Sequence, residues 1–225
     1  MCMKNDFPKS EQTIKPPKLI KRKLVEGIPS GCVLDREQYR SLSLSGVNLS
    51  NQVAAHVSFE EVLFSQVNMA NTQLEEVRLE DARLSTCNLM TANWYKAGLY
   101  RTELIGCRMT GFLAAEALFQ DVLFKDCQIN LAQLRFARFK AVRFEHCDLS
   151  EADLLEADLS QVVLVDCNLQ NVELSGSKLG GVDLRTCNLD GARVGIHELR
   201  GATINLQQAI SLVQALGIKV EFQGE

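Results

Sequence analysis

The sequence predicts an all-β solenoid, a β-helix that makes one coil every 20 residues. An apolar residue falls at every fifth position from Leu44 to Ile204, and a second series, mostly Ala, Val or Cys, lies two residues earlier. Six cysteines recur at intervals of 20 residues, from Cys87 to Cys187. All four prolines precede residue 30, so none interrupts the repeat, where a missing backbone N–H would break the hydrogen-bond ladder.

A period of five excludes a continuous helix or strand. Every fifth residue drifts around a helix, and an odd step changes face along a strand. A short extended piece with two inward residues, followed by a tight turn, satisfies the period. Four such sides form a coil, and residues 20 apart then stack. The column after the cysteines holds stacked amides, which can bond the turn backbone and each other: Asn48, Asn68, Asn88, Asn168 and Asn188.

The chain divides into three parts. Residues 1–31 hold every proline and an excess of basic residues, and we expect an extended or disordered arm. Residues 32–204 form the repeats of the β-helix. Residues 205–225 are expected to form an amphipathic helix and a short strand, which cap the open end of the solenoid or make a dimer contact.

The predicted C-terminal helix has recognisable ends. Asn205 can serve as its N-cap, and Gly217 is a plausible stop. Its apolar residues share one helical face. This candidate cap or dimer face consists of Leu206, Ala209, Ile210, Val213 and Leu216.

Neither the composition nor any constellation of residues in the sequence indicates catalytic chemistry. The 225 residues carry a net charge of −4, which is not a nucleic-acid footprint, and no run of about 18 apolar residues predicts a membrane span. The cysteine column is expected to be buried packing, because stacked thiols lie along a line and do not converge on a metal. His56, His146 and His197 lie in different columns. We therefore expect a cytoplasmic protein with reduced thiols that is not an enzyme and has no metal or cofactor.

Outward-facing residues suggest two surfaces for a partner. The first is an apolar belt near the middle of the solenoid, consisting of Met90, Tyr95, Tyr100, Ile105, Leu113, Leu118 and Leu123. The second follows a basic band of Arg135, Arg138, Lys140 and Arg143. It is an acidic band of Glu145, Asp148, Glu151, Asp153, Glu156 and Asp158. A contiguous apolar patch is typical of a partner site, whereas partial burial of the belt and solvation of the bands are the alternatives.

The repeat resembles that of the pentapeptide-repeat proteins, whose pattern is a small residue, Asp or Asn, Leu, and two polar residues. It is seen in CNLMT (87–91), CDLSE (147–151), ADLLE (152–156) and CNLQN (167–171). The resemblance covers residues 42–204. It implies a right-handed quadrilateral β-helix of about eight 20-residue coils, in which the large and the small residue of each unit point inward.

The sequence and the resemblance suggest three hypotheses for the function. The first is a non-enzymatic scaffold that binds an unidentified protein partner. The second comes from the resemblance: some members mimic DNA, bind DNA gyrase or topoisomerase, and protect it from quinolones. Such members dimerise through their C-terminal ends, so the C-terminal helix is also a candidate homodimer contact. The third, least favoured because of its two prolines, is attachment of the basic segment 14–24 to an anionic membrane. Neither direct nucleic-acid binding nor a membrane partner is expected.

Overall fold

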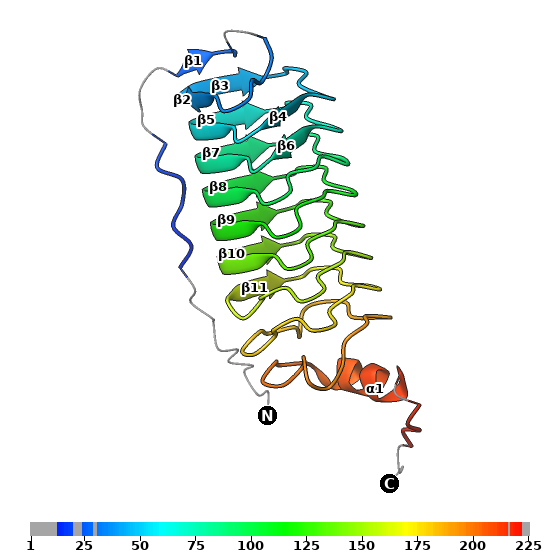
Figure 1. The fold of residues 1–225 in the computed structure, drawn as a ribbon. Helices are drawn as coiled ribbons and strands as arrows, with labels where there is room; N and C mark the ends of the chain where they lie inside the picture. The colour runs from blue at the N-terminus through cyan, green and yellow to red at the C-terminus, as the bar shows by residue number, and fades with distance from the viewer. Residues whose placement is uncertain (1–12, 20–23, 29–30, 216, 222–225) are drawn as a thin grey trace.

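The computed structural model is a β-helix closed at its C-terminal end by one helix (Figure 1). It describes residues 13–19, 24–28, 31–215 and 217–221. Parallel strands stack along the solenoid, and one sheet follows the order β1-β3-β5-β7-β8-β9-β10-β11, while β4 pairs with β6 on another side. The predicted β-helix with a C-terminal helix is confirmed. Within the described ranges, no helix is long and apolar enough to cross a membrane.

The strands follow the predicted 20-residue interval. In the main sheet every registered partner of β5 in β7 lies 20 residues later, as in the pair Phe59 and Leu79. The same register continues through β8, β9, β10 and β11. The strands are β1 (Val25–Glu26), β2 (Gln38–Arg40), β3 (Leu42–Ser45), β4 (Val53–Ala55), β5 (Ser58–Ser65), β6 (Gln73–Glu75), β7 (Arg78–Ser85), β8 (Gly98–Ile105), β9 (Leu118–Lys125), β10 (Arg138–Glu145) and β11 (Val162–Val165).

The backbone turns a corner every five residues, and the corner residues adopt left-handed backbone dihedral angles. Glu61, Asp81, Arg101 and Asp121, for example, have φ between 46° and 55°. Between two corners the inward residues are buried and their neighbours face outward, as the five-residue period predicts. The asparagine column also forms as expected, since Asn88 Nδ2 donates to Asn68 Oδ1 at 3.0 Å. Backbone hydrogen bonds therefore tie each coil to the next, and side-chain amides add to them where the column holds asparagine.

The interior is filled by side chains of complementary size. Trp94 and Phe112 are both 1 % exposed, and their rings meet edge to face at 5.4 Å between centroids. The small Ala114 stacks in the Trp94 column one coil later, which leaves room for both rings. Thr72, unusual at an inward position, accepts a hydrogen bond from the indole N–H of Trp94 at 3.4 Å. The irregular inward residues thus compensate one another.

The six cysteines of the column, Cys87 to Cys187, are buried free thiols. In the first five of them, Cys87 to Cys167, each Sγ lies within hydrogen-bond distance of two backbone carbonyls; Cys127 Sγ, for example, is 3.3 Å from both the Leu104 and the Lys125 oxygen. Hydrogen bonds with the thiols of Cys127 and Cys87, together with burial, raise the pKa of Cys107, so this thiol is protonated at neutral pH. Cys2 lies outside the described residues. The geometry agrees with a packing role.

The C-terminal helix α1 (Leu206–Ala215) begins with a reciprocal capping box. The Gln208 N–H donates to Asn205 Oδ1 at 2.9 Å, and the Asn205 N–H donates to Gln208 Oε1 at 2.8 Å. Gln208 Nε2 also donates to the carbonyls of Leu184 and Cys187, both at 2.7 Å. The predicted N-cap is therefore correct, and Gln208 joins the helix to the last coil.

The apolar face expected for this helix is only partly covered. Leu206 is 75 % exposed, whereas Ala209, Ile210 and Val213 are half-buried. The reason is that Gln208, rather than Leu206, points into the end of the solenoid. Leu216 lies outside the described residues. The expected short strand is wrong over 217–221, which has no strand pairing in the structure.

The described parts of the N-terminal arm, residues 13–19, 24–28 and 31, include segments that pack against the solenoid. β1 pairs in parallel with β3, with Val25 opposite Leu42, and it covers the first edge of the solenoid. Ile28, just after β1, is buried in the core. Further upstream, residues 13–19 run alongside the strands (Figure 1).

Candidate functional site

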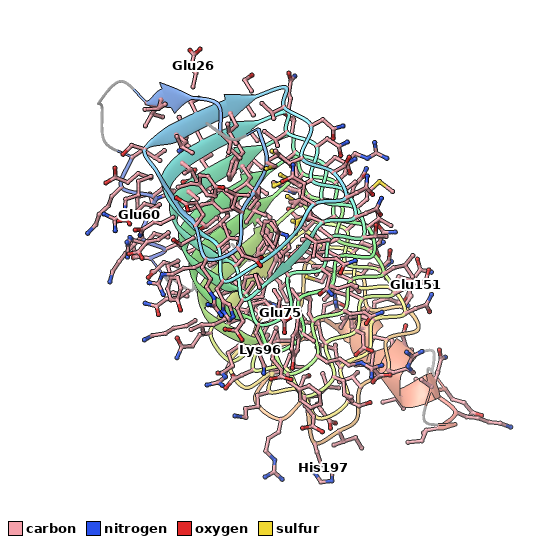
Figure 2. All side chains as sticks on the ribbon, turned by 45° about the horizontal axis from the view of Figure 1, so that its top comes forward. Glu26, Glu60, Glu75, Lys96, Glu151 and His197 are labelled. Carbon is pink, nitrogen blue, oxygen red and sulfur yellow. The ribbon has the colours of Figure 1, made fainter. Side chains whose placement is uncertain are left out.

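One side of the solenoid carries a shallow hollow of about 500 Å³, which we call the lateral groove. It lies on the side of β4 and β6, which continues through bridges from Gln73 to Asn93, Leu113 and Gln133. Figure 2 shows Glu75 and Lys96 on the same side of the molecule, away from Glu60 and Glu151. The groove is lined by Asp35, Val53, Ala54, Ala55, Gln73, Glu75, Asn93, Tyr95, Leu113, Ala115 and Gln133.

A column of uncharged residues runs along this groove. Its outward side chains in five successive coils, here called the neutral column, are Val53, Gln73, Asn93, Leu113 and Gln133. At a strand spacing of ~4.8 Å, the column extends over about 19 Å. The same column becomes charged in the following coils, at Asp153 and Glu173. The uncharged surface is therefore confined to the N-terminal half of this side.

Tyr95 is held as a fixed aromatic surface inside the groove. Its hydroxyl donates to Glu116 Oε1 at 2.7 Å, and this carboxylate raises the pKa of Tyr95. Lys96 Nζ lies 5.0 Å from the centroid of the Tyr95 ring and 3.8 Å from Glu116 Oε2. A ring fixed in this way loses little conformational entropy when a partner packs against it.

Two exposed apolar residues stand at the corners on either side of Gln133, the last residue that lines the groove. Leu131 is 48 % and Phe136 45 % exposed, and both occupy corners with φ of 59°. Left-handed backbone is unusual for such large side chains. Phe136 also borders a second hollow, of about 560 Å³, with Lys96, Glu116 and Arg138. Sequence reasoning missed both residues, although large apolar residues at the otherwise polar corner position were a usable signal.

The predicted belt does not form one patch. Its seven residues are all half-buried and are distributed over different sides of the solenoid. Tyr95 and Leu113 lie in the lateral groove, whereas Ile105, Leu118 and Leu123 are outward residues of β8 and β9 on other sides. Residues chosen five positions apart lie on successive sides of a coil. They therefore surround the solenoid and do not form a patch on one face.

Two belt residues are also covered by cations. Arg78 lies over the ring of Tyr100, with its guanidinium carbon 4.1 Å from the centroid. The Arg108 guanidinium lies 3.3 Å from Met90 Sδ. Partial burial under neighbouring long side chains, the alternative considered from sequence, describes these two positions.

Half of the members of the acidic and basic bands form ion pairs with each other or with neighbouring charges. Arg135 lies 2.5 Å from Asp153, and Lys178 lies 3.2 Å from Asp158. Glu145 contacts both Arg143, at 2.5 Å, and Lys125, at 3.8 Å.

The remaining members of the two bands have other environments. Asp148 accepts a hydrogen bond from Asn168 Nδ2 at 3.0 Å and so belongs to the amide column. Glu151 and Glu156 stand exposed at corners, and Arg138 and Lys140 are exposed. The structure therefore brings opposite charges together and does not produce a continuous acidic surface from these six carboxylates.

The C-terminal end carries a third hollow, which is apolar and has a volume of about 680 Å³; we call it the terminal hollow. It lies between the last coil and α1, and Ile196 and Ile218 on its border are 70 % and 55 % exposed. Val213 of the predicted helix face lines it, but Leu206 and Ile210 do not. The described residues contain no cluster of His, Cys, Asp and Glu that could hold a metal ion.

Comparisons with known proteins agree with the repeat. The family model described as a pentapeptide repeat region matches residues 77–145 and 137–210, and that described as pentapeptide repeats (8 copies) matches residues 43–81. Comparison with curated proteins gives no match. The matches to family models extend over most of the chain.

Two solved structures show similarity at the level of the fold. QnrB1, a plasmid-mediated fluoroquinolone resistance protein, is 18 % identical with a TM-score of 0.37, and the match covers 82 % of this chain and 100 % of that chain. HetL, involved in heterocyst differentiation regulation in the cyanobacterium Nostoc sp., is 19 % identical with a TM-score of 0.28, and the match covers 76 % and 90 %. On the evidence of the family models and the repeat itself, the chain belongs to the pentapeptide repeat family.

Proposed function

We propose that the protein is a non-enzymatic scaffold that binds a protein partner through the lateral groove. The observation that carries this proposal is the neutral column, which has five uncharged outward residues beside the fixed ring of Tyr95. Interface centres are depleted in charge and enriched in aromatic residues. On the main sheet, by contrast, opposite charges pair between coils, as in Arg83 and Glu103 at 2.7 Å.

The ends of the groove supply apolar contacts that a partner can bury. Val53 is 68 % exposed at one end, and Leu131 and Phe136 stand at the other. The charged pair Lys96 and Glu116 lies at the border, where it remains partly solvated. A neutral column beside an aromatic ring, with charged residues at the border, agrees with the depletion of charge and enrichment of aromatic residues at protein interfaces.

The experiment is capture of the partner from the source cell with the full-length protein and two variants. Ala115→Arg places a long charged side chain in the groove, at an outward position that leaves the core unchanged. Ser65→Arg is the matched control at an outward position of β5, on another side. We expect Ala115→Arg to lose the partner and Ser65→Arg to retain it. Equal capture by both variants would place the partner elsewhere.

DNA mimicry toward gyrase or topoisomerase is the alternative function. Its support is the family resemblance and the excess of acidic over basic residues. The pairing of Arg135 with Asp153 and of Lys178 with Asp158 counts against it, because mimicry of a duplex needs unpaired acidic strips along the axis. A supercoiling assay with DNA gyrase decides the matter, and no effect at micromolar protein would exclude this function.

A homodimer through the C-terminal end is a related proposal. The exposed Ile196, Leu206 and Ile218 at or near the terminal hollow support it, because a second copy would cover them. Light scattering on the wild type and on Ile196→Asp provides the test, and a monomeric wild type would refute the proposal.

The buried, reduced cysteine column supports a cytoplasmic location.

A further inference from the structure

Residues 13–19 are docked against one corner of the solenoid. The Lys15 N–H donates to Asp121 Oδ1 at 3.2 Å, and the Lys18 N–H donates to Asp81 Oδ1 at 2.8 Å. Asp81 and Asp121 are each 7 % exposed, and no other corner residue of the described repeats is buried. The arm therefore contacts a defined line along the axis, which we call the corner site.

The spacing of the two donors along an extended peptide matches the spacing of the two carboxylates along the solenoid. A polyproline II chain repeats every three residues and rises 3.1 Å per residue, so Lys15 and Lys18 point their amides the same way about 9 Å apart. Asp81 and Asp121 are two coils apart, which is about 9.6 Å at ~4.8 Å per coil. Pro16 and Pro17 between the two lysines favour this backbone conformation. The peptide and the corner thus have the same repeat.

The coil between the two carboxylates has the opposite chemistry. Its corner residue, Arg101, binds Asp81 through Nε and Nη2, both at 2.7 Å, and Glu80 through Nη2 at 2.6 Å. A guanidinium has no hydrogen-bond acceptor, and the two prolines opposite this coil have no N–H to donate. The acceptor–donor–acceptor order of the corner therefore fits a segment with the order amide, proline, proline, amide.

The side chains of the segment indicate that its backbone is recognised. Lys15 and Lys18 have exposed side chains although their N–H groups are bonded. Ile14 and Pro17, three residues apart and so on one face of a polyproline II helix, are half-buried. Positive charge adds attraction toward the acidic corner, but the hydrogen bonds come from the main chain.

We propose that the corner site is a recognition site for extended peptides of the form X-Pro-Pro-X, in which both X residues keep their amide N–H. Residues 13–19 occupy it in cis, so a partner that carries such a segment has to displace the arm. The site lies on a different column from the lateral groove, and it does not depend on the proposed function.

An NMR titration of the full-length protein tests the site directly. In the double variant Lys15→Pro/Lys18→Pro, four consecutive prolines favour the polyproline conformation, and both donors are lost. The isotope-labelled variant is titrated with the blocked peptide TIKPPKL, the sequence of residues 13–19. A tethered segment competes at an effective concentration of about a millimolar. We therefore expect the peptide to bind the variant at least tenfold more tightly than the wild type, with shifts at Asp81, Arg101 and Asp121.

Matched changes separate backbone recognition from charge. The same peptide with both Lys→Pro changes, which lacks both donors, must fail to bind, whereas the peptide with both Lys→Ala changes, which keeps the donors without the charges, must still bind. Binding of the Lys→Pro peptide, loss of binding of the Lys→Ala peptide, or equal binding of TIKPPKL to wild type and variant would overturn the proposal. In the wild type, hydrogen exchange of the Lys15 and Lys18 amides gives a second reading. Asp121→Ala should speed exchange at Lys15 at least tenfold, whereas Lys15→Ala and Lys18→Ala should preserve protection. Loss of protection in the alanine variants would show that charge alone holds the arm.

Discussion

Gln208 closes the hydrogen-bond ladder of the solenoid, and its replacement by alanine is a sensitive test of how the fold ends. In preceding coils the carbonyl oxygens of Cys147 and Cys167 accept from the backbone N–H groups of Asn168 and Asn188, at 2.9 and 3.0 Å. No further coil follows Cys187 to donate a backbone N–H to its oxygen, and Gln208 Nε2 donates to this oxygen instead, at 2.7 Å. The side chain thus substitutes for the backbone N–H of a missing coil.

The cost of Gln208→Ala can be worked from these contacts. Alanine keeps the backbone N–H that donates to Asn205 Oδ1, but it removes the acceptor of the Asn205 N–H, and loss of that one hydrogen bond costs about 1 kcal/mol. The Cys187 oxygen then loses a buried partner, which costs about 1–3 kcal/mol. Leu184 O is affected less, because it still accepts from the Cys187 N–H at 2.9 Å. The sum is about 2–4 kcal/mol, confined to the last coil because coils of a solenoid interact with their neighbours only.

Hydrogen exchange resolves such a local change. Since 1.4 kcal/mol corresponds to a factor of ten, amides of residues 182–204 should exchange roughly 30- to 700-fold faster in Gln208→Ala. Those of β5 to β10 should be unchanged. Gln207→Ala, at the exposed neighbouring position of the same helix, is the control and should leave the last coil protected. Unchanged protection of residues 182–204 in Gln208→Ala would refute the idea that this side chain completes the ladder.

Three further predictions concern the core, the thiols and pH. Trp94→Ala should lower the stability by about 3–5 kcal/mol, seen as a lower Tm, because the Ala114 beneath it cannot fill the cavity; a change below about 1 kcal/mol would contradict the packing described. Cys127→Val should cost less than about 1.5 kcal/mol, and the six column thiols should react with a thiol reagent only after unfolding, so rapid labelling of the native protein would contradict their burial. Glu173, whose pKa is lowered to about 2 by hydrogen bonds from Ser175 and by Arg193, should stabilise the fold above pH 4.5 and lose that effect as the pH falls toward 2. In acid-unfolding curves, Glu173→Gln should reduce the stability that is lost between pH 4.5 and 2, by less than about 1 kcal/mol. The same loss of stability in the variant as in the wild type would argue against the pairing.

Most of the architecture could be predicted because the fold is periodic. A period of five determines which side chains face inward, and an interval of 20 determines which residues stack, so the buried Leu and Cys columns and the bonded Asn column follow from counting alone. Asn205 was recognisable as a cap from its local chemistry. Gln208 also lies 20 residues after Asn188, yet its role depends on a side chain replacing a backbone group, which no hydrophobic pattern signals.

The candidate site was harder to predict for a physical reason. The belt combined residues by position within a coil, but a patch requires neighbours on one side, and only Tyr95 and Leu113 meet that condition in the groove. The neutral column is recognised by what its members lack, namely charge, over five coils. Docking of residues 13–19 uses main-chain amides, whose partners are not encoded in the identity of Lys15 or Lys18.

Photo-crosslinking in the source cell tests the central claim most directly, since it reports where the solenoid touches its partner. A photoreactive amino acid at position 115 lies in the lateral groove, and the same group at position 65 faces outward from β5 on another side. We predict a single crosslinked protein from position 115, absent from position 65 and abolished when Phe136→Asp removes the apolar end of the groove. Crosslinks from position 65 to the same protein, with none from position 115, would contradict the assignment of the lateral groove as the partner surface.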